Sequence, residues 1–122
     1  MTVTQIHELN EKFQKGAVQL SELIPSGTLM QATSMLIRSS RKIDEQFIKL
    51  LKASSDEVFN QTLSLLEDET DEVLFILDQL ELANKTQKIS LIDDFLKDGY
   101  DLMSIYSRCF DALIDKKIKE EQ

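Results

Sequence analysis

The sequence predicts an all-α protein, an antiparallel up-down-up-down bundle of four helices. The chain has 122 residues with only three glycines and one proline, so few positions interrupt a helix. Four long stretches carry apolar residues at alternating three- and four-residue steps, which is the period of one helical face. The stretches have comparable lengths and short turns between them, which favours antiparallel neighbours in a single domain over residues 1–122.

The first helix is predicted over about residues 2–24. Thr2 and Gln5 stand three residues apart and can form a capping box at its start. Its buried face is predicted to comprise Ile6, Leu9, Phe13, Ala17, Leu20 and Ile24. Gly16 lies inside this helix, where a glycine costs about 1 kcal/mol against alanine, so we expect close packing around it. Residues 25–27 include the only proline and are predicted to end the helix.

The second helix is predicted over about residues 28–53. Its apolar face follows the helical period and comprises Leu29, Ala32, Leu36, Ile43, Phe47 and Leu50. Five of the 14 basic residues of the chain also lie here, at Arg38, Arg41, Lys42, Lys49 and Lys52. The turn that follows is so short that we expect the next helix to lie antiparallel beside this one.

The third helix, predicted over about residues 55–83, is the most acidic part of the chain. Residues 54–84 hold nine acidic side chains and no Lys, Arg or His. Ser54 and Glu57 are predicted to form a capping box at its start. Its main buried face is predicted to comprise Phe59, Leu63, Leu66, Thr70, Val73, Leu77 and Leu80. The basic second helix beside this acidic helix is a favourable match of charge.

The fourth helix is predicted over about residues 90–118, with Ser90 and Asp93 as its cap. The polar residues 84–88 before it are predicted to form a loop or a frayed first turn. The apolar face of the helix comprises Ile92, Phe95, Leu96, Leu102, Met103, Tyr106, Phe110, Leu113 and Ile114. Gly99 interrupts this face, and we expect a close approach of another helix there.

The second and third helices carry a pattern of residues that resembles a known family. In the second helix the pattern is Arg38, Ser39, Ile43 and Gln46. At the start of the third helix it is Ser55, Asp56, Glu57 and Phe59, and further along it is Glu69, Glu72, Val73, Phe75, Ile76 and Leu77. At this spacing, residues 36–82 resemble the small bacterial four-helix-bundle proteins first recognised in intervening sequences of 23S ribosomal RNA genes. Gln46 stands where that family usually has Asn, Val73 where it has Thr, and Ile76 where it has Trp.

The resemblance implies a left-handed four-helix bundle, often assembled as a homopentamer, with no known catalytic site. One branch of the family assists the reverse transcriptases of diversity-generating retroelements and binds nucleic acid through a basic surface. This chain has a formal net charge of −8, which disfavours nucleic acid as a partner because phosphate binding requires positive charge.

The third helix has a second, partly apolar flank beside its main buried face. At 100° per residue, Glu69 and Glu72 lie about 70° and about 130° away from the main stripe. We predict a subunit interface on this flank, comprising Val58, Leu65, Glu69, Glu72 and Ile76 together with Arg38 of the second helix. The alternative is a solvated flank with scattered aliphatic residues. Arg38 is expected to pair with Glu69 or Glu72, either within the hairpin or between subunits.

No catalytic site, metal site or cofactor is predicted. A carboxylate-bridged di-iron site, the sharpest enzymatic alternative for an acidic four-helix bundle, requires a Glu-x-x-His pattern on two helices. The chain has a single histidine, His7, and no Glu stands three residues before it. His7 is expected to be an exposed helix residue. Cys109 is expected to be a structural thiol, since the adjacent Arg108 points to another side of the helix.

These observations predict a non-enzymatic scaffold or accessory protein that contacts itself, as a homo-oligomer such as a pentamer, and an unidentified protein partner. The alternative is a nucleic-acid-binding accessory protein that uses Arg38, Arg41, Lys42, Lys49 and Lys52. A lone cysteine suits a reducing compartment, and no apolar run approaches ~18 residues, so we expect a cytoplasmic protein without membrane contact.

Overall fold

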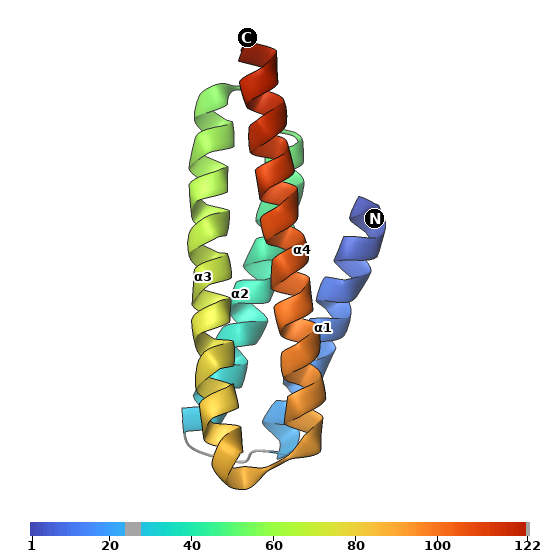
Figure 1. Cartoon of the computed structure of the whole chain (residues 1–122), viewed down its shortest axis with the longest axis vertical. Coiled ribbons are helices and arrows are strands. Elements are labelled where there is room, and N and C mark those ends of the chain that lie inside the picture. The colour runs from blue at the N-terminus through green and yellow to red at the C-terminus, as the bar shows by residue number, and fades with distance from the viewer. Residues whose placement is uncertain (24–27, 122) are drawn as a thin grey trace.

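The computed structural model describes residues 1–23 and 28–121, and these residues form four helices and no strand (Figure 1). The helices are α1 (Val3–Leu23), α2 (Thr28–Leu51), α3 (Asp56–Gln87) and α4 (Ser90–Glu121). The prediction of an all-α chain with four helices is confirmed. The predicted break at residues 25–27 and the predicted core residue Ile24 lie outside the described residues, as does the side chain of Leu29.

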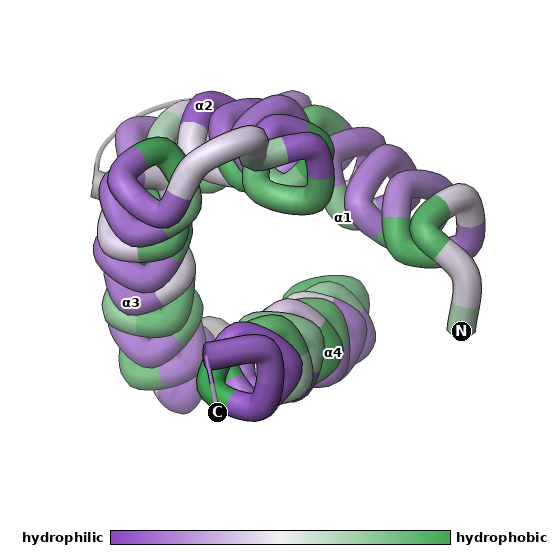
Figure 2. Tube along the Cα trace, turned by 90° about the horizontal axis from the view of Figure 1, so that it is seen from above, coloured by the Kyte–Doolittle hydropathy of each residue, from purple (hydrophilic) through white to green (hydrophobic). Residues whose placement is uncertain are grey.

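The four helices pack around one core as a bundle. Each helix contacts two others: α1 lies against α2 and α4, and α3 lies against α2 and α4. Viewed from above, the helices follow one another around the core in chain order (Figure 2). At 21 residues α1 is shorter than α3 and α4, which have 32 residues each. The other three helices therefore continue beyond the start of α1 (Figure 1).

Most residues of the predicted apolar stripes form the core, whereas Leu9, Ala32, Leu113 and Ile114 are partly buried and pack against it. Buried side chains on α1 are Ile6, Asn10, Phe13, Ala17 and Leu20, at three- and four-residue steps, with Asn10 in place of the predicted Leu9, which is half-buried. Aromatic rings join helices that are distant in sequence. The rings of Phe13 on α1 and Phe95 on α4 stack with centroids 4.8 Å apart, and Phe47 on α2 meets Tyr106 on α4 edge to face at 5.3 Å.

The two helical glycines mark close contacts, as predicted. A Cβ atom on Gly99 would lie 2.8 Å from the ring of Phe13 and 3.0 Å from a methyl group of Leu77. A Cβ atom on Gly16 would lie 3.0 Å from the ring of Phe95. The absence of a side chain at Gly99 thus allows α4 to pack against side chains of both α1 and α3.

The starts of the helices agree with the predictions in part. At α1, the Thr2 N–H donates to Gln5 Oε1 at 2.8 Å and the Gln5 N–H donates to Thr2 Oγ1 at 3.2 Å, so the predicted capping box is confirmed. At α3 the cap is Ser55 and not Ser54, because the Ser55 hydroxyl accepts from the Val58 N–H. Both serines stand before the acidic first turn, and the sequence did not distinguish them.

The prediction of a loop over residues 84–88 is wrong, because α3 continues to Gln87. The buried Asn84 holds the turn that follows. Its amide donates to Ile89 O at 3.1 Å and to Asp93 Oδ1 at 2.9 Å, and its Oδ1 accepts from the Ile89 N–H at 2.8 Å. Lys88 then leaves the helix in a left-handed conformation, with φ of 54°. Asp93, predicted to pair with Ser90, thus receives a hydrogen bond from Asn84 instead.

Candidate interaction surface

The flank of α3 that was predicted to be a subunit interface faces α2 of the same chain over much of its length. Ile76 is only 2 % exposed and belongs to the core, so its assignment to a surface is corrected. Val58, Glu69 and Glu72 are half-buried, and only Leu65 is exposed. The physical reason is that a helix with two neighbours in a bundle buries a wider arc than the single stripe used in the prediction.

Glu69, one of the two expected partners of Arg38, forms an ion pair with a different cation of α2. Glu69 Oε1 lies 3.1 Å from Lys42 Nζ, one turn further along α2. The Lys42 side chain is half-exposed to solvent, so the pair contributes no more than about 1 kcal/mol to stability. Arg38 is exposed, and the described residues include no acidic group within 4.0 Å of it. Within one chain, therefore, neither Glu69 nor Glu72 forms the predicted bridge with Arg38.

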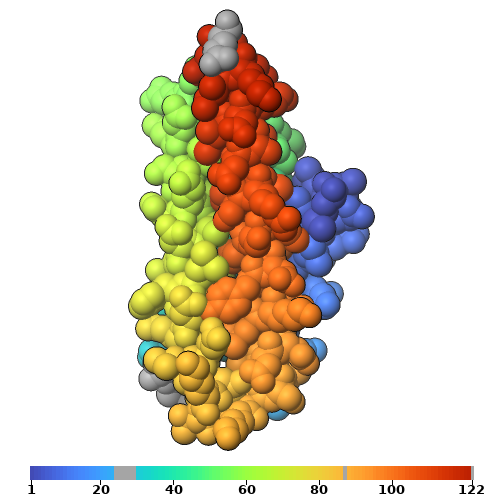
Figure 3. Space-filling model, in the orientation of Figure 1, coloured from blue at the N-terminus to red at the C-terminus, as the bar shows by residue number. Residues whose placement is uncertain are grey.

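The outer side of α3 carries apolar residues that no neighbouring helix covers. Leu65 is 42 % exposed, Phe75 is 59 % exposed and Leu82 is 68 % exposed. Together with Glu72 and Gln79 they lie at positions 65, 72, 75, 79 and 82 of one helical face, which also carries the exposed Asp68. We call these five residues the α3 stripe. Figure 3 shows α3 and α4 side by side along one face of the molecule, with α3 at its edge.

Phe75 and Leu82 were not predicted from the sequence to be surface residues. Phe75 was noted only as part of a family pattern, and Leu82 was given no role. Phe75 and Leu82 are seven residues apart, so they lie on the same side of α3, opposite the core residues Leu66 and Leu80. This spacing could have identified them as exposed. A large apolar residue opposite the core stripe of an amphipathic helix is expected to be exposed.

The outer side of α2 is basic. All five residues of the predicted nucleic-acid patch are exposed: Arg38, Arg41, Lys42, Lys49 and Lys52. One acidic residue, Glu45, is exposed among them, and of the five cations only Lys42 is in an ion pair with a described residue. Met30 and Ile48 are also exposed on α2, at 44 % and 41 %. We call this side of the helix the α2 basic face.

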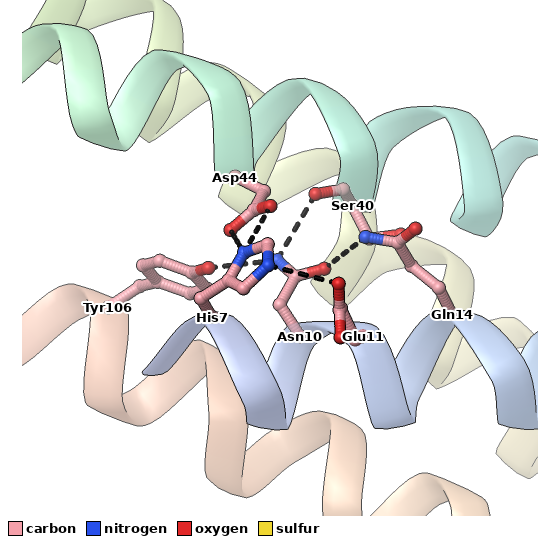
Figure 4. A network of polar contacts seen from close by, with 7 residues as sticks. All are labelled: His7, Asn10, Glu11, Gln14, Ser40, Asp44 and Tyr106. Atoms are coloured by element: carbon pink, nitrogen blue, oxygen red, sulfur yellow. Dashed lines mark hydrogen bonds and ion pairs between the residues drawn. The ribbon is translucent and has the colours of Figure 1, made fainter. Parts of the chain in front are cut away.

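A buried polar network joins α1, α2 and α4 (Figure 4). Asn10 is fully buried, and its amide donates to Ser40 O at 3.1 Å and to Tyr106 Oη at 2.8 Å. Its carbonyl accepts from Gln14 Nε2 at 2.6 Å. Tyr106 is also fully buried, and burial raises the pKa of its hydroxyl. Every polar atom of Asn10 that faces the core has a partner, as burial requires.

His7 lies beside this network and bridges α1 to α2 (Figure 4). Its Nδ1 is 2.7 Å from Asp44 Oδ2, and its Nε2 is 3.0 Å from Glu11 Oε1. The hydrogen bond and charge of Asp44, with a smaller contribution from Glu11, raise the pKa of His7 above its ordinary value of 6.5. His7 is thus half-exposed and paired, whereas the sequence predicted a plain exposed residue. Both ring nitrogens are engaged, which leaves neither free to act as a base.

The remaining reactive groups have structural environments. Cys109 is half-buried, and burial raises the pKa of its thiol, which keeps it in the less nucleophilic protonated form. Within residues 1–23 and 28–121, no three His, Cys, Asp or Glu side chains are grouped so that they could hold a metal ion. None of the described helices combines the length and apolar composition needed to span a membrane.

Comparison of the chain with family models, curated proteins and solved structures finds no match in any of the three. The resemblance of residues 36–82 to the 23S rRNA intervening-sequence family therefore remains a prediction.

We predict that Tyr106→Phe lowers the free energy of unfolding by about 1–3 kcal/mol, because one Asn10 N–H is left buried without an acceptor. In an Asn10→Leu background that donor is absent, so the same change should cost much less. Urea unfolding of the four proteins of this double-mutant cycle measures the coupling. Equal costs of Tyr106→Phe in the two backgrounds would contradict the hydrogen bond.

We also predict that the pKa of His7 lies above 6.5 in the folded protein. Because the folded pKa is raised, the pairing stabilises the fold fully below about pH 6.5 and this stabilisation is lost as the pH rises through the folded pKa. His7 is the only histidine, so its ring proton can be followed by NMR without ambiguity. Asp44→Asn should shift the pKa downward, and Glu11→Gln should shift it less; the reverse order would contradict the geometry.

Proposed function

We propose that the chain is an antiparallel up-down-up-down four-helix bundle that acts, without enzymatic activity, as a self-associating scaffold or accessory protein in the cytoplasm. The observation that carries this proposal is the α3 stripe, with Phe75 and Leu82 more than half exposed. In Figure 1 the colour runs in alternating directions along successive helices, and the connections α2–α3 and α3–α4 are short. Both observations support the up-down-up-down topology.

The α3 stripe supports a protein-binding role because its apolar residues share one face. Single exposed aliphatic side chains are common on any soluble protein and carry no such meaning. An exposed aromatic side chain with aliphatic residues on the same helical face, and acidic residues around them, is typical of an interaction surface. Phe75 is the type of residue that contributes most to binding when a partner covers it.

The absence of a reactive centre among the described residues supports a role that needs no catalysis. The ring nitrogens of His7 are engaged by Asp44 and Glu11, and burial raises the pKa of the Cys109 thiol. The polar atoms of Asn10 and Tyr106 satisfy one another inside the bundle. His7, Cys109, Asn10 and Tyr106 thus each have a structural role in the bundle. The resemblance noted above favours a homopentamer as the assembled form.

A second candidate function is nucleic-acid binding through the α2 basic face. The observation that favours it is the exposure of Arg38, Arg41, Lys49 and Lys52 without ion-pair partners among the described residues. Four such cations can contact phosphates, and the binding would weaken steeply with salt. The formal net charge of −8 opposes the approach of a polyanion, so we place this function second.

Light scattering on purified protein, with absorbance at 260 and 280 nm recorded on the same peak, tests the proposal. We expect a mass that is a small multiple of 14.0 kDa and an absorbance ratio of protein alone. The same mass at about 0.5 M salt would show an association that does not depend on bound nucleic acid. A monomer at all concentrations would contradict self-association, and a peak rich in nucleic acid that salt removes would favour the second candidate.

A further inference from the structure

We propose that the partner of the α3 stripe is the α2 basic face of a second copy of this chain. The contact is head-to-tail: each copy offers its α3 stripe to one neighbour and its α2 basic face to the other. This inference rests on the proposed function, because it names the two surfaces through which the scaffold associates with itself.

The apolar part of the contact is available on both surfaces. Phe75 and Leu82 project from α3 with more than half of their surface exposed, and Met30 on α2 is 44 % exposed. No other helix of the same chain covers these residues. An aromatic anchor and an aliphatic pair at the centre of a contact, surrounded by charged residues, is the usual arrangement in protein interfaces.

The charges select α2 as the partner. The α3 stripe is acidic: it contains the half-buried Glu72, and the exposed Asp68, Asp71 and Asp78 lie in or beside it. The α2 basic face instead presents the exposed cations Arg38, Arg41, Lys42, Lys49 and Lys52. The two surfaces are therefore complementary in charge, which favours and orients their encounter.

The same charges oppose the symmetric alternative. In a two-fold dimer made by α3 alone, each acidic residue would face the acidic surface of the other copy. A dimer made by α2 alone would bring cations together in the same way. Like charges in a contact cost free energy, so both two-fold arrangements are disfavoured against the head-to-tail contact.

The heights of the residues along the bundle agree with this contact. Lys42 Nζ and Glu69 Oε1 are 3.1 Å apart, so the two residues lie at similar heights on α2 and α3. With α2 and α3 antiparallel, and a rise of about 1.5 Å per residue, Arg38 lies level with Glu72 and Met30 lies level with Leu82. In a ring whose axis is parallel to the helices, all copies have the same height. Arg38 of one copy then meets Glu72 and the ring of Phe75 of the next.

The position of the two surfaces favours a closed ring. They lie on neighbouring helices of the bundle and not on opposite sides of it (Figure 2). A chain of head-to-tail contacts therefore turns at every copy, and a contact that turns by a constant angle can close into a ring. Surfaces on opposite sides would instead extend the assembly in a straight line.

Phe75→Asp tests the proposal, with the oligomer mass measured by sedimentation equilibrium over a range of concentrations. We expect the self-association of this variant to weaken by about 30-fold or more, because the aromatic anchor is lost and another acidic charge is added. The matched control is Leu91→Asp, which adds the same charge at an exposed leucine on α4, outside both surfaces. It should associate like the wild type.

The charge pair is tested independently of Phe75. Arg38→Glu and Glu72→Lys should each weaken association by about 10-fold, and the double variant should recover to within about 3-fold of the wild type. Arg38 is exposed and Glu72 is partly exposed, so these variants are expected to keep the helical circular dichroism of the wild type.

The outcomes separate this inference from the proposed function. A wild-type oligomer that Phe75→Asp leaves intact, or a double variant no better than the single ones, would overturn the inference and leave the scaffold proposal standing. A monomeric wild type would overturn both. If Arg38→Glu removed bound nucleic acid from the wild-type peak without changing the protein mass, the α2 basic face would be a nucleic-acid surface, and the inference would be overturned.

Discussion

A helix in a four-helix bundle can bury only the arc that faces its two neighbours, and this limit determines both the fold and the surface of this protein. For α3 the buried arc faces α2 and α4, and it holds Leu66, Val73, Ile76, Leu77 and Leu80. Apolar residues outside this arc stay in contact with water unless another chain covers them. Phe75 and Leu82 are such residues, so the packing of the bundle itself creates the surface that we propose for assembly.

The same limit explains the polar residues inside the bundle. The stripe of α1 that faces the core includes Asn10, a residue that cannot be buried without hydrogen-bond partners. Ser40 on α2 and Tyr106 on α4 supply them, and His7 adds a bridge to Asp44 nearer the surface. These contacts come from three helices at one height. These hydrogen bonds favour one position of the short helix α1 along α2 and α4. Other positions that buried the same apolar residues would leave the Asn10 amide unpaired.

The sequence predicted the fold well because a fold of this kind depends on local signals. The helical period, the Thr2–Gln5 capping box and the two glycines each act within a few residues, and the structure confirms them. The errors have equally local causes. The polar composition of residues 84–88 suggested a loop, but the inward-facing Asn84 keeps α3 helical to Gln87. Ile76 was placed on a surface because the prediction used one stripe, whereas contact with α2 widens the buried arc.

The candidate site was predicted less well than the fold. The five basic residues of α2 that were predicted as an alternative nucleic-acid patch are exposed, since charged residues opposite an apolar stripe are exposed in an amphipathic helix. The network of Asn10 and Tyr106 joins residues 96 positions apart, and no pattern in the sequence pairs them before the arrangement of α1 and α4 is known. The partner of Glu69 was also not predictable from the sequence. Glu69 pairs with Lys42, which lies one turn along α2 from the expected Arg38.

The contact between α2 of one copy and α3 of the next is tested most directly by a disulfide placed across it. Ser34 and Gln79 are exposed on the outer sides of α2 and α3 and lie at similar heights, and Cys109→Ser removes the native thiol. Ser34 and Gln79 lie on the sides of their helices away from the core stripes, so Ser34→Cys and Gln79→Cys are expected to bond between copies and not within one chain. Mild oxidation is predicted to give a ladder of covalent multiples that ends at the ring size on a non-reducing gel. A chain that stays monomeric on the gel, while light scattering shows an oligomer, would contradict the account.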